Sequence, residues 1–152
     1  MSFLEKLDES ERIIKAIDHL LYVTYPLIKD KRMLLKILEE ARKAIANCIN
    51  SILQYEYLKK NIELSRDSKT NLKTFIDKCS QKYSVSEKEM KNVLDLFELV
   101  ENHKKSSFEF LRGSKVVILS ETMTEKYLTV EKTKEFLILA KNILKKTKEN
   151  LA

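Results

Sequence analysis

The sequence predicts a mainly α protein: a bundle of four to five helices with a long central helix and a small β-hairpin near the C-terminal third. The 152 residues include a single glycine and a single proline. An average domain has about 7% glycine and about 5% proline, so this chain has few places for sharp turns. Apolar residues also recur at helical spacing over most of the chain. The length favours one domain, over residues 1–152.

The first helix is expected over Ser2–Tyr25, where apolar residues repeat every three to four positions. Pro26 has no amide hydrogen, so the helix is expected to kink or end at Tyr25. Asp30 is then the expected N-cap of a longer helix that reaches about Asn61. That helix carries a strict repeat of four and three residues, made by Leu34, Leu38, Ala41, Ile45, Cys48, Ile52 and Tyr55. A heptad-like repeat predicts a nearly parallel or antiparallel neighbouring helix.

The middle of the chain is predicted to be helical with polar breaks. Residues 63–70 are expected to form a polar loop, and a shorter helix follows over about Asn71–Lys82. Ser86 and Glu89 have the spacing of a capping box, in which each side chain accepts the other residue's backbone N–H. They predict the start of a helix that ends near His103.

A second capping-box pattern follows at Ser106 and Glu109. We expect it to start a short helical turn that ends at Gly113, because glycine is the residue that most often stops a helix. The turn would hold Phe108, Phe110 and Leu111.

The last third changes in character. Lys115–Ser120 is apolar and β-branched without helical periodicity, and Glu125–Val130 is expected to pair back on it as a hairpin. Thr129 is the expected N-cap of a final helix that runs to about Lys148. A basic stripe opposite the apolar face of this helix could follow a phosphate backbone. The stripe consists of Lys134, Lys141, Lys145 and Lys148.

Composition restricts the classes of function. The net charge is +6, and residues 101–152 hold eleven basic against seven acidic side chains. This bias permits contact with nucleic acid or an acidic protein, and it also fits a lysine-rich protein with no such partner. No apolar stretch approaches the roughly 20 residues of a membrane span, and the acidic amphipathic start resembles no targeting peptide. Two cysteines are typical of a reducing compartment, so we expect a cytoplasmic protein.

One glycine excludes a glycine-rich phosphate loop, and the cysteines and histidines lack the spacing of a zinc site. We expect no metal and no cofactor.

Arg12 and His19 are the first candidate pair for chemistry, because seven residues place them on one helix face about two turns apart. They resemble the R-x(4–6)-H signature of HEPN ribonucleases, which are also all-helical. The resemblance implies a metal-independent ribonuclease acting as a homodimer, with Arg12 stabilising phosphate charge and His19 transferring a proton. The residue after the arginine is Ile13, where that family usually has a polar side chain. The alternative is a solvated helix face.

The second candidate is an anion site formed by consecutive polar residues before the expected helical turn. It consists of His103, Lys104, Lys105, Ser106 and Ser107, followed by Arg112 and Lys115. Cations and hydroxyls beside a helix N-terminus would bind phosphate without a glycine loop. The alternative is that the cations complement the negative end of the preceding helix. Tyrosines could stack on bases, but Tyr55 lies in the heptad-like repeat and the others, Tyr57, Tyr83 and Tyr127, are scattered.

A wider resemblance covers nearly the whole chain. Asp18–Arg32, His103–Arg112 and Lys115–Ser120 resemble segments of small all-helical archaeal proteins of unassigned function, and this resemblance implies no activity. Because the last third has an excess of basic side chains, we expect a binding or interaction module that contacts an acidic partner through its basic C-terminal part. The alternatives are the ribonuclease and a purely structural bundle that would show an exposed apolar patch.

Overall fold

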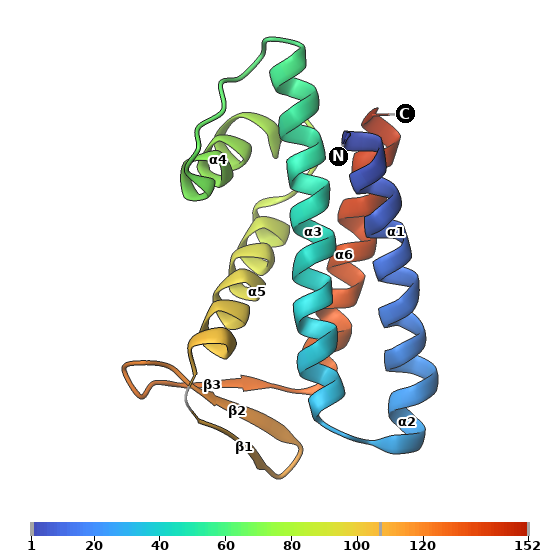
Figure 1. The fold of residues 1–152 in the computed structure, drawn as a ribbon, viewed down its shortest axis with the longest axis vertical. Coiled ribbons are helices and arrows are strands. Elements are labelled where there is room, and N and C mark those ends of the chain that lie inside the picture. Colours follow the sequence, from blue (N-terminus) through green and yellow to red (C-terminus); the bar gives the residue numbers. More distant parts are fainter. Residues whose placement is uncertain (1, 107, 152) are drawn as a thin grey trace.

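The computed structural model describes residues 2–106 and 108–151, and it confirms the mainly α prediction. Five helical segments stand roughly side by side in the described part of the chain, and a small sheet lies at one end (Figure 1). In chain order the elements are α1 (Phe3–His19), the π-helical turn η1 (Leu20–Thr24), α2 (Tyr25–Ile28), α3 (Arg32–Leu58), α4 (Ser68–Thr74), the π-helical turn η2 (Phe75–Cys79), α5 (Glu87–Lys105), β1 (Glu109–Arg112), β2 (Lys115–Leu119), β3 (Glu125–Leu128) and α6 (Val130–Leu151).

The first helical segment extends further than Tyr25. In η1 the Tyr25 N–H donates to the carbonyl of Leu20, five residues back, which widens the helix by one residue. Pro26 then lies in the first turn of α2, where its missing donor is tolerated, and the path stays helical to Ile28. Of the two predicted outcomes, an end at Tyr25 is wrong by three residues, and the α-helix is instead interrupted by a π turn directly before the proline.

The central helix α3 begins at Arg32 and ends at Leu58, close to the predicted bounds. The N-cap residue is Lys31, one residue later than the predicted Asp30, although the Asp30 carboxylate accepts the Arg32 N–H at 2.9 Å. Ala41 and Ala44 are fully buried, and Ser10 of α1 donates to the Ala44 carbonyl at 2.9 Å. The small side chains on this helix therefore let α1 pack closely, and α6 packs on it as well.

The helices between residues 59 and 105 follow the predicted order with shifted bounds. Asp67 caps α4, four residues before the expected start, and η2 continues it to Cys79. The capping box of Ser86 and Glu89 is present at the start of α5, as predicted. The Glu89 carboxylate also receives the Lys146 ammonium of α6 at 2.5 Å, which ties these two helices together.

The structure contradicts the helical turn expected at Ser106–Glu109. Ser106 is extended, and its hydroxyl bonds the backbone of Phe108, which is a turn rather than a helix cap. The next residues form β1, paired antiparallel with β2 in a three-stranded sheet of order β1-β2-β3. Gly113 has φ of 62° in the turn between β1 and β2, so it makes a hairpin turn instead of ending a helix. The predicted pairing of β2 with β3 is confirmed.

The final helix α6 begins where the sequence predicted. The Thr129 hydroxyl accepts the Lys132 N–H at 3.0 Å and caps the helix. Phe136, Ala140 and Ile143 are buried against the other helices. Among the described residues, no helix combines the length and the apolar character needed to cross a membrane.

Candidate functional site

The sheet has one face on the bundle and one face turned away from it. Val116, Ile118 and Leu128 belong to the core, and Lys126 pairs with Glu98 of α5, so these alternate positions face the helices. Their chain neighbours must point to the other side, because side chains alternate along a strand. The Leu119 N–H donates to the Phe108 carbonyl, which extends the register by one pair. We call this side the outer sheet face; it carries Phe108, Phe110, Arg112, Lys115, Val117, Glu125 and Tyr127.

Aromatic rings and cations lie together on the outer sheet face. The rings of Phe108 and Phe110 are 5.5 Å apart, and the Arg112 guanidinium lies 5.3 Å from the centre of the Phe110 ring. The Lys115 ammonium lies 5.0 Å from the centre of the Tyr127 ring. These distances are typical of cation–π contacts. Three strands thus bring two cations onto aromatic rings.

Glu125 fixes this arrangement from β3. Its two oxygens each accept one Arg112 N–H at 3.1 Å, and it also accepts the Tyr127 hydroxyl. The bonds from Tyr127 and then Arg112 lower the pKa of Glu125, and its carboxylate raises the pKa of both donors. The guanidinium is therefore held by a bidentate pair, which limits its orientations.

The rings remain open to a ligand. The side chain of Phe108 is 58% exposed and that of Tyr127 is 43% exposed, while Val117 between the flanking strands is fully buried. Exposed rings can stack on flat π systems, and the adjacent cations can contact anions. The outer sheet face can therefore bind a ligand that is both aromatic and negatively charged.

Two residues of the predicted anion site, Arg112 and Lys115, lie on the outer sheet face, and the residues before them do not. Lys105 pairs with Glu101 on its own helix at 3.1 Å, and Ser106 bonds the backbone instead of facing a ligand. Lys104 makes no ion pair with any residue that the structure describes. Ser107 lies outside the described residues. With a strand in place of a helix, these side chains do not surround a helix N-terminus.

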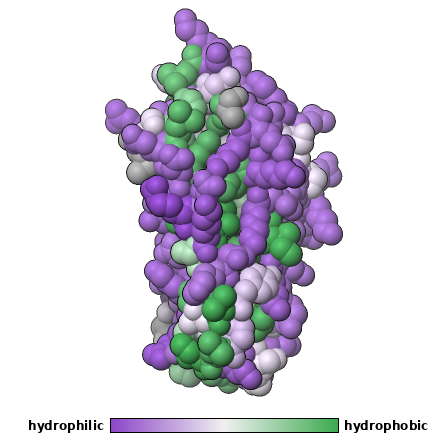
Figure 2. All heavy atoms as spheres, turned by 90° about the vertical axis from the view of Figure 1, so that its right-hand side faces the viewer, coloured by the Kyte–Doolittle hydropathy of each residue, from purple (hydrophilic) through white to green (hydrophobic). Residues whose placement is uncertain are grey.

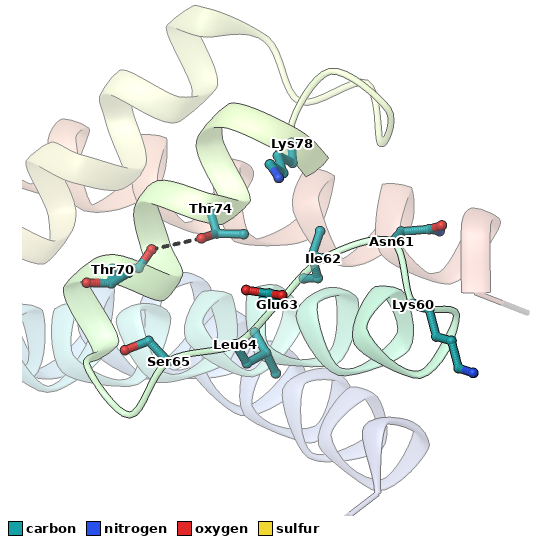
Figure 3. Close-up of a pocket in the computed structure, with 9 residues that line it drawn as sticks. All are labelled: Lys60, Asn61, Ile62, Glu63, Leu64, Ser65, Thr70, Thr74 and Lys78. Atoms are coloured by element: carbon teal, nitrogen blue, oxygen red, sulfur yellow. Dashed lines mark hydrogen bonds between the residues drawn. The ribbon is translucent and has the colours of Figure 1, made fainter.

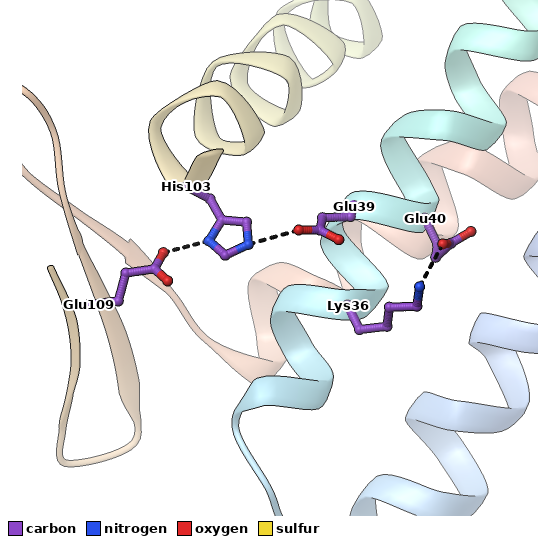
Figure 4. A network of polar contacts seen from close by, with 5 residues as sticks. All are labelled: Lys36, Glu39, Glu40, His103 and Glu109. Carbon is purple, nitrogen blue, oxygen red and sulfur yellow. Dashed lines mark hydrogen bonds and ion pairs between the residues drawn. The ribbon is translucent and has the colours of Figure 1, made fainter. Parts of the chain in front are cut away.

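His103 contacts two carboxylates (Figure 4). Its Nδ1 lies 2.5 Å from Glu109 of β1, and its Nε2 lies 2.8 Å from Glu39 of α3. Carboxylates accept hydrogen bonds, and a neutral imidazole has only one N–H to donate. Both contacts are therefore hydrogen bonds only when the trio holds an additional proton. His103 joins the sheet to the central helix and faces no open anion site.

The predicted basic stripe of α6 lies beside α1. Lys141 pairs with Asp18, and Lys148 pairs with Glu11 at 2.8 Å. Lys134 lies 5.7 Å from the centre of the Tyr22 ring. Lys145 is exposed and makes no ion pair within residues 2–106 and 108–151. Most of this stripe therefore contacts the first helix and does not form a continuous track of free cations.

Arg12 and His19 are both exposed on α1. Arg12 lines a shallow hollow of about 310 Å³ between α1 and α3, together with Ile13 and Glu40, but His19 does not. The structure therefore keeps the two on one exposed helix and places only the arginine at a hollow.

A polar hollow lies at the end of the bundle far from the sheet, where α3 ends and α4 begins. It is open and measures about 480 Å³. Figure 3 shows the residues around it. Its rim carries Lys60, Lys78 and the hydroxyls of Thr70 and Thr74 around a single carboxylate, Glu63. The Thr74 hydroxyl donates to the Thr70 carbonyl within the helix, so it is engaged by its own backbone.

The cysteines are structural. Both are buried, and burial raises the pKa of Cys48 and of Cys79 to about 11. Such thiols stay protonated near neutral pH and are poor nucleophiles.

Sequence reasoning missed Phe108 and Phe110 as residues of the outer sheet face. The signal that could have identified them is the alternation of Phe108, Phe110 and Arg112 at every second position, which is the period of a strand. Among the described residues, no group of three or more His, Cys, Asp or Glu side chains could hold a metal ion. No family model, no curated protein and no solved structure matches this chain.

Proposed function

We propose that the protein is a non-enzymatic binding module that contacts single-stranded nucleic acid through the outer sheet face. The observation that carries the proposal is the set of exposed rings, Phe108 and Tyr127, beside the ring-bound cations Arg112 and Lys115. Unpaired bases stack on aromatic side chains, and arginine and lysine neutralise the adjoining phosphates. The net charge of +6 favours the same polyanion.

The aromatic rings favour nucleic acid over an acidic protein. An acidic peptide would use the cations but would not need a row of rings, whereas each unpaired base offers a flat surface to a ring. Single strands are also favoured over duplexes, because bases stacked within a duplex cannot reach a side chain on a sheet. The sheet has three short strands, so the proposed contact covers only a few nucleotides.

The test is a titration of the protein into a fluorescently labelled single-stranded RNA of mixed sequence, read by anisotropy at low and moderate salt. Tyr127→Ala and Phe108→Ala should each weaken binding about tenfold, since stacking on one ring contributes about 1–3 kcal/mol per base. Tyr57→Ala is the matched control, because Tyr57 is 51% exposed at the other end of the bundle. Lys115→Ala should reduce the salt dependence by about one phosphate contact.

Binding that is equal in Tyr127→Ala and Tyr57→Ala, or that does not change with salt, would overturn the proposal. A gel of the same RNA reports cleavage in the same samples. Cleavage that is lost in His19→Ala would favour the HEPN-like ribonuclease with Arg12 and His19, and this result would replace the binding module as the proposed function.

A further inference from the structure

The first helical segment contains an apolar position that the core does not use. Leu7, Ile14, Leu21 and Ile28 follow one another at intervals of seven, which is the spacing of a single helix face. The first three are 4%, 6% and 2% exposed, but Ile28 is 60% exposed. A continuous α-helix would place all four on the same side, so something between Leu21 and Ile28 turns the last one outward.

The π turn η1 provides the rotation. Its hydrogen bond joins Leu20 and Tyr25, five residues apart instead of the four of an α-helix, so the residues after the turn are rotated relative to those before it. The α2 helix then ends at Ile28, and Lys29 follows in the left-handed region at φ of 57°. Ile28 therefore faces solvent although it shares the heptad position of Leu21, and Leu27 beside it is exposed as well.

The outcome is a contiguous apolar surface at the sheet end of the bundle. We call it the α2 patch: Tyr22, Val23, Leu27 and Ile28, with exposed fractions of 46%, 49%, 82% and 60%. Figure 2 shows apolar side chains gathered at the lower end of the molecule, over α2. Isolated exposed aliphatic side chains are common, but a gathered group of them is typical of a binding surface.

Unpaired cations surround the α2 patch. Lys134 of α6 lies over the Tyr22 ring, and Lys29 follows Ile28 directly. The Lys31 ammonium donates to the Tyr25 hydroxyl at 2.6 Å. None of these three lysines forms an ion pair with a residue that the structure describes, whereas the nearby carboxylate of Asp30 is occupied by Arg32 at 2.7 Å. The charge at the rim of the patch is therefore positive.

A hollow of about 340 Å³ begins at Asp30, two residues after Ile28 in the chain. It lies between the start of α3 and the sheet, and its apolar lining comes from Leu35, Phe110, Leu111 and Val116. Leu111 is 60% exposed at its edge. The hollow is large enough to receive an apolar side chain of a partner.

We propose that the α2 patch and this hollow bind an amphipathic helical segment of another protein, with aliphatic side chains on one face and Asp or Glu beside them. The aliphatic face covers Leu27 and Ile28, and the carboxylates meet Lys29, Lys31 and Lys134. A second copy of this chain fits poorly, because two positive rims would repel each other. A flat anionic lipid surface would leave the hollow between α3 and the sheet empty.

The test uses a synthetic fluorescent peptide that forms an amphipathic helix of leucine and glutamate, with anisotropy as the readout. A second peptide has lysine in place of glutamate, and a third has the composition of the first with the leucine stripe broken. The acidic amphipathic peptide should bind, and the double variant Leu27→Ser/Ile28→Ser should weaken its binding about tenfold or more. The matched control is Tyr57→Ser/Leu58→Ser, which changes two side chains of 51% and 62% exposure at the far end of the bundle.

Charge reversal separates the two parts of the surface. Lys29→Glu/Lys134→Glu should weaken the acidic peptide and strengthen the basic one, while Lys69→Glu/Lys73→Glu on α4 should change neither. Tyr127→Ala should leave peptide binding unchanged, so failure of this proposal is distinct from failure of the nucleic-acid interface. Equal binding of the acidic and basic peptides would overturn the proposal. So would unaltered binding in the Leu27/Ile28 variant, concentration-dependent dimerisation through α2, or binding of anionic vesicles in preference to the peptide.

Discussion

The two ends of the bundle treat charged side chains in opposite ways. At the α4 end, the Glu56 carboxylate is only 1% exposed, and three donors surround it. Lys82 lies 2.6 Å away, Asn61 donates at 2.7 Å, and the Tyr83 hydroxyl donates at 3.1 Å. At the sheet end, by contrast, the cations Lys29, Lys31 and Lys134 beside the exposed Leu27 and Ile28 make no ion pair with a residue that the structure describes. Both ends expose some apolar side chains, among them Tyr57 and Leu58 at the α4 end, so the difference lies in how each end treats charge.

The difference separates a contact that stabilises the fold from the surface for which we propose a partner. Burial by itself raises the pKa of Glu56, but the bonds from Asn61, Lys82 and Tyr83 outweigh it, so the pKa is lowered and the carboxylate stays ionised. A buried charge with every partner in place ties α3 to the segment after η2. Exposed aliphatic side chains contribute little to folding, so their placement is explained better by a partner.

The largest expected difference in stability is between variants of Leu21 and Ile28, two residues that share one heptad position. Leu21→Ala should lower the free energy of unfolding by about 2–5 kcal/mol, because it removes a buried side chain and leaves a cavity. Ile28→Ala at the same heptad position should change it by less than about 0.5 kcal/mol, because Ile28 faces solvent. Urea unfolding followed by circular dichroism measures both. A loss above about 2 kcal/mol in Ile28→Ala would show that the α2 patch is buried.

The next effect tests the buried carboxylate at the α4 end. Glu56→Gln keeps the size of the side chain but replaces charged hydrogen bonds with neutral ones, so we expect a loss of about 2 kcal/mol in the free energy of unfolding. Glu63→Gln is the matched control, because Glu63 is exposed on the rim of the neighbouring hollow. Equal stability of the two variants would contradict a structural role for Glu56. RNA binding at the outer sheet face should be the same in both.

Acid should reduce the contribution of Glu56. The folded-state pKa lies below the usual value of 4.5, so the unfolded chain takes up a proton first as the pH falls. The stabilisation is therefore complete above about pH 5 and is lost as the pH drops through the folded-state pKa. The difference in unfolding free energy between the wild type and Glu56→Gln should shrink as the pH falls below about 5. A difference that grows on acidification would contradict the lowered pKa.

Much of the fold could be predicted because local signals and packing agree. The heptad-like repeat of Leu34 to Tyr55 predicted α3, and the capping box of Ser86 and Glu89 predicted α5. The Ser106–Glu109 capping box failed because pairing with β2 determined the outcome. Aromatic residues at alternate positions fit a strand as well as a helical turn, and a strand partner decides between them.

The candidate site was less predictable, because charge pairing depends on tertiary neighbours. Lys141 and Lys148 looked like free cations in the sequence, but Asp18 and Glu11 are 123 and 137 positions away in the chain and lie beside them. The exposure of Ile28 depends on a π turn, and the helical pattern alone gives it the same role as Leu21. The sequence placed Arg112 in a predicted anion site. Its aromatic neighbours could be found only once the register of the sheet was known.

The smallest expected effect concerns the contact between the sheet and the central helix. The imidazole ring of His103 contacts Glu109 and Glu39 through nitrogens on opposite sides. The single amide group of a His103→Gln variant cannot reproduce both contacts. We expect a loss of about 1 kcal/mol in the free energy of unfolding and faster amide exchange in β1. His19→Gln removes an exposed histidine from α1 and should change neither quantity. Amide exchange in β1 that is equal in His103→Gln and in the wild type would mean that the contacts of the ring do not join the sheet to α3.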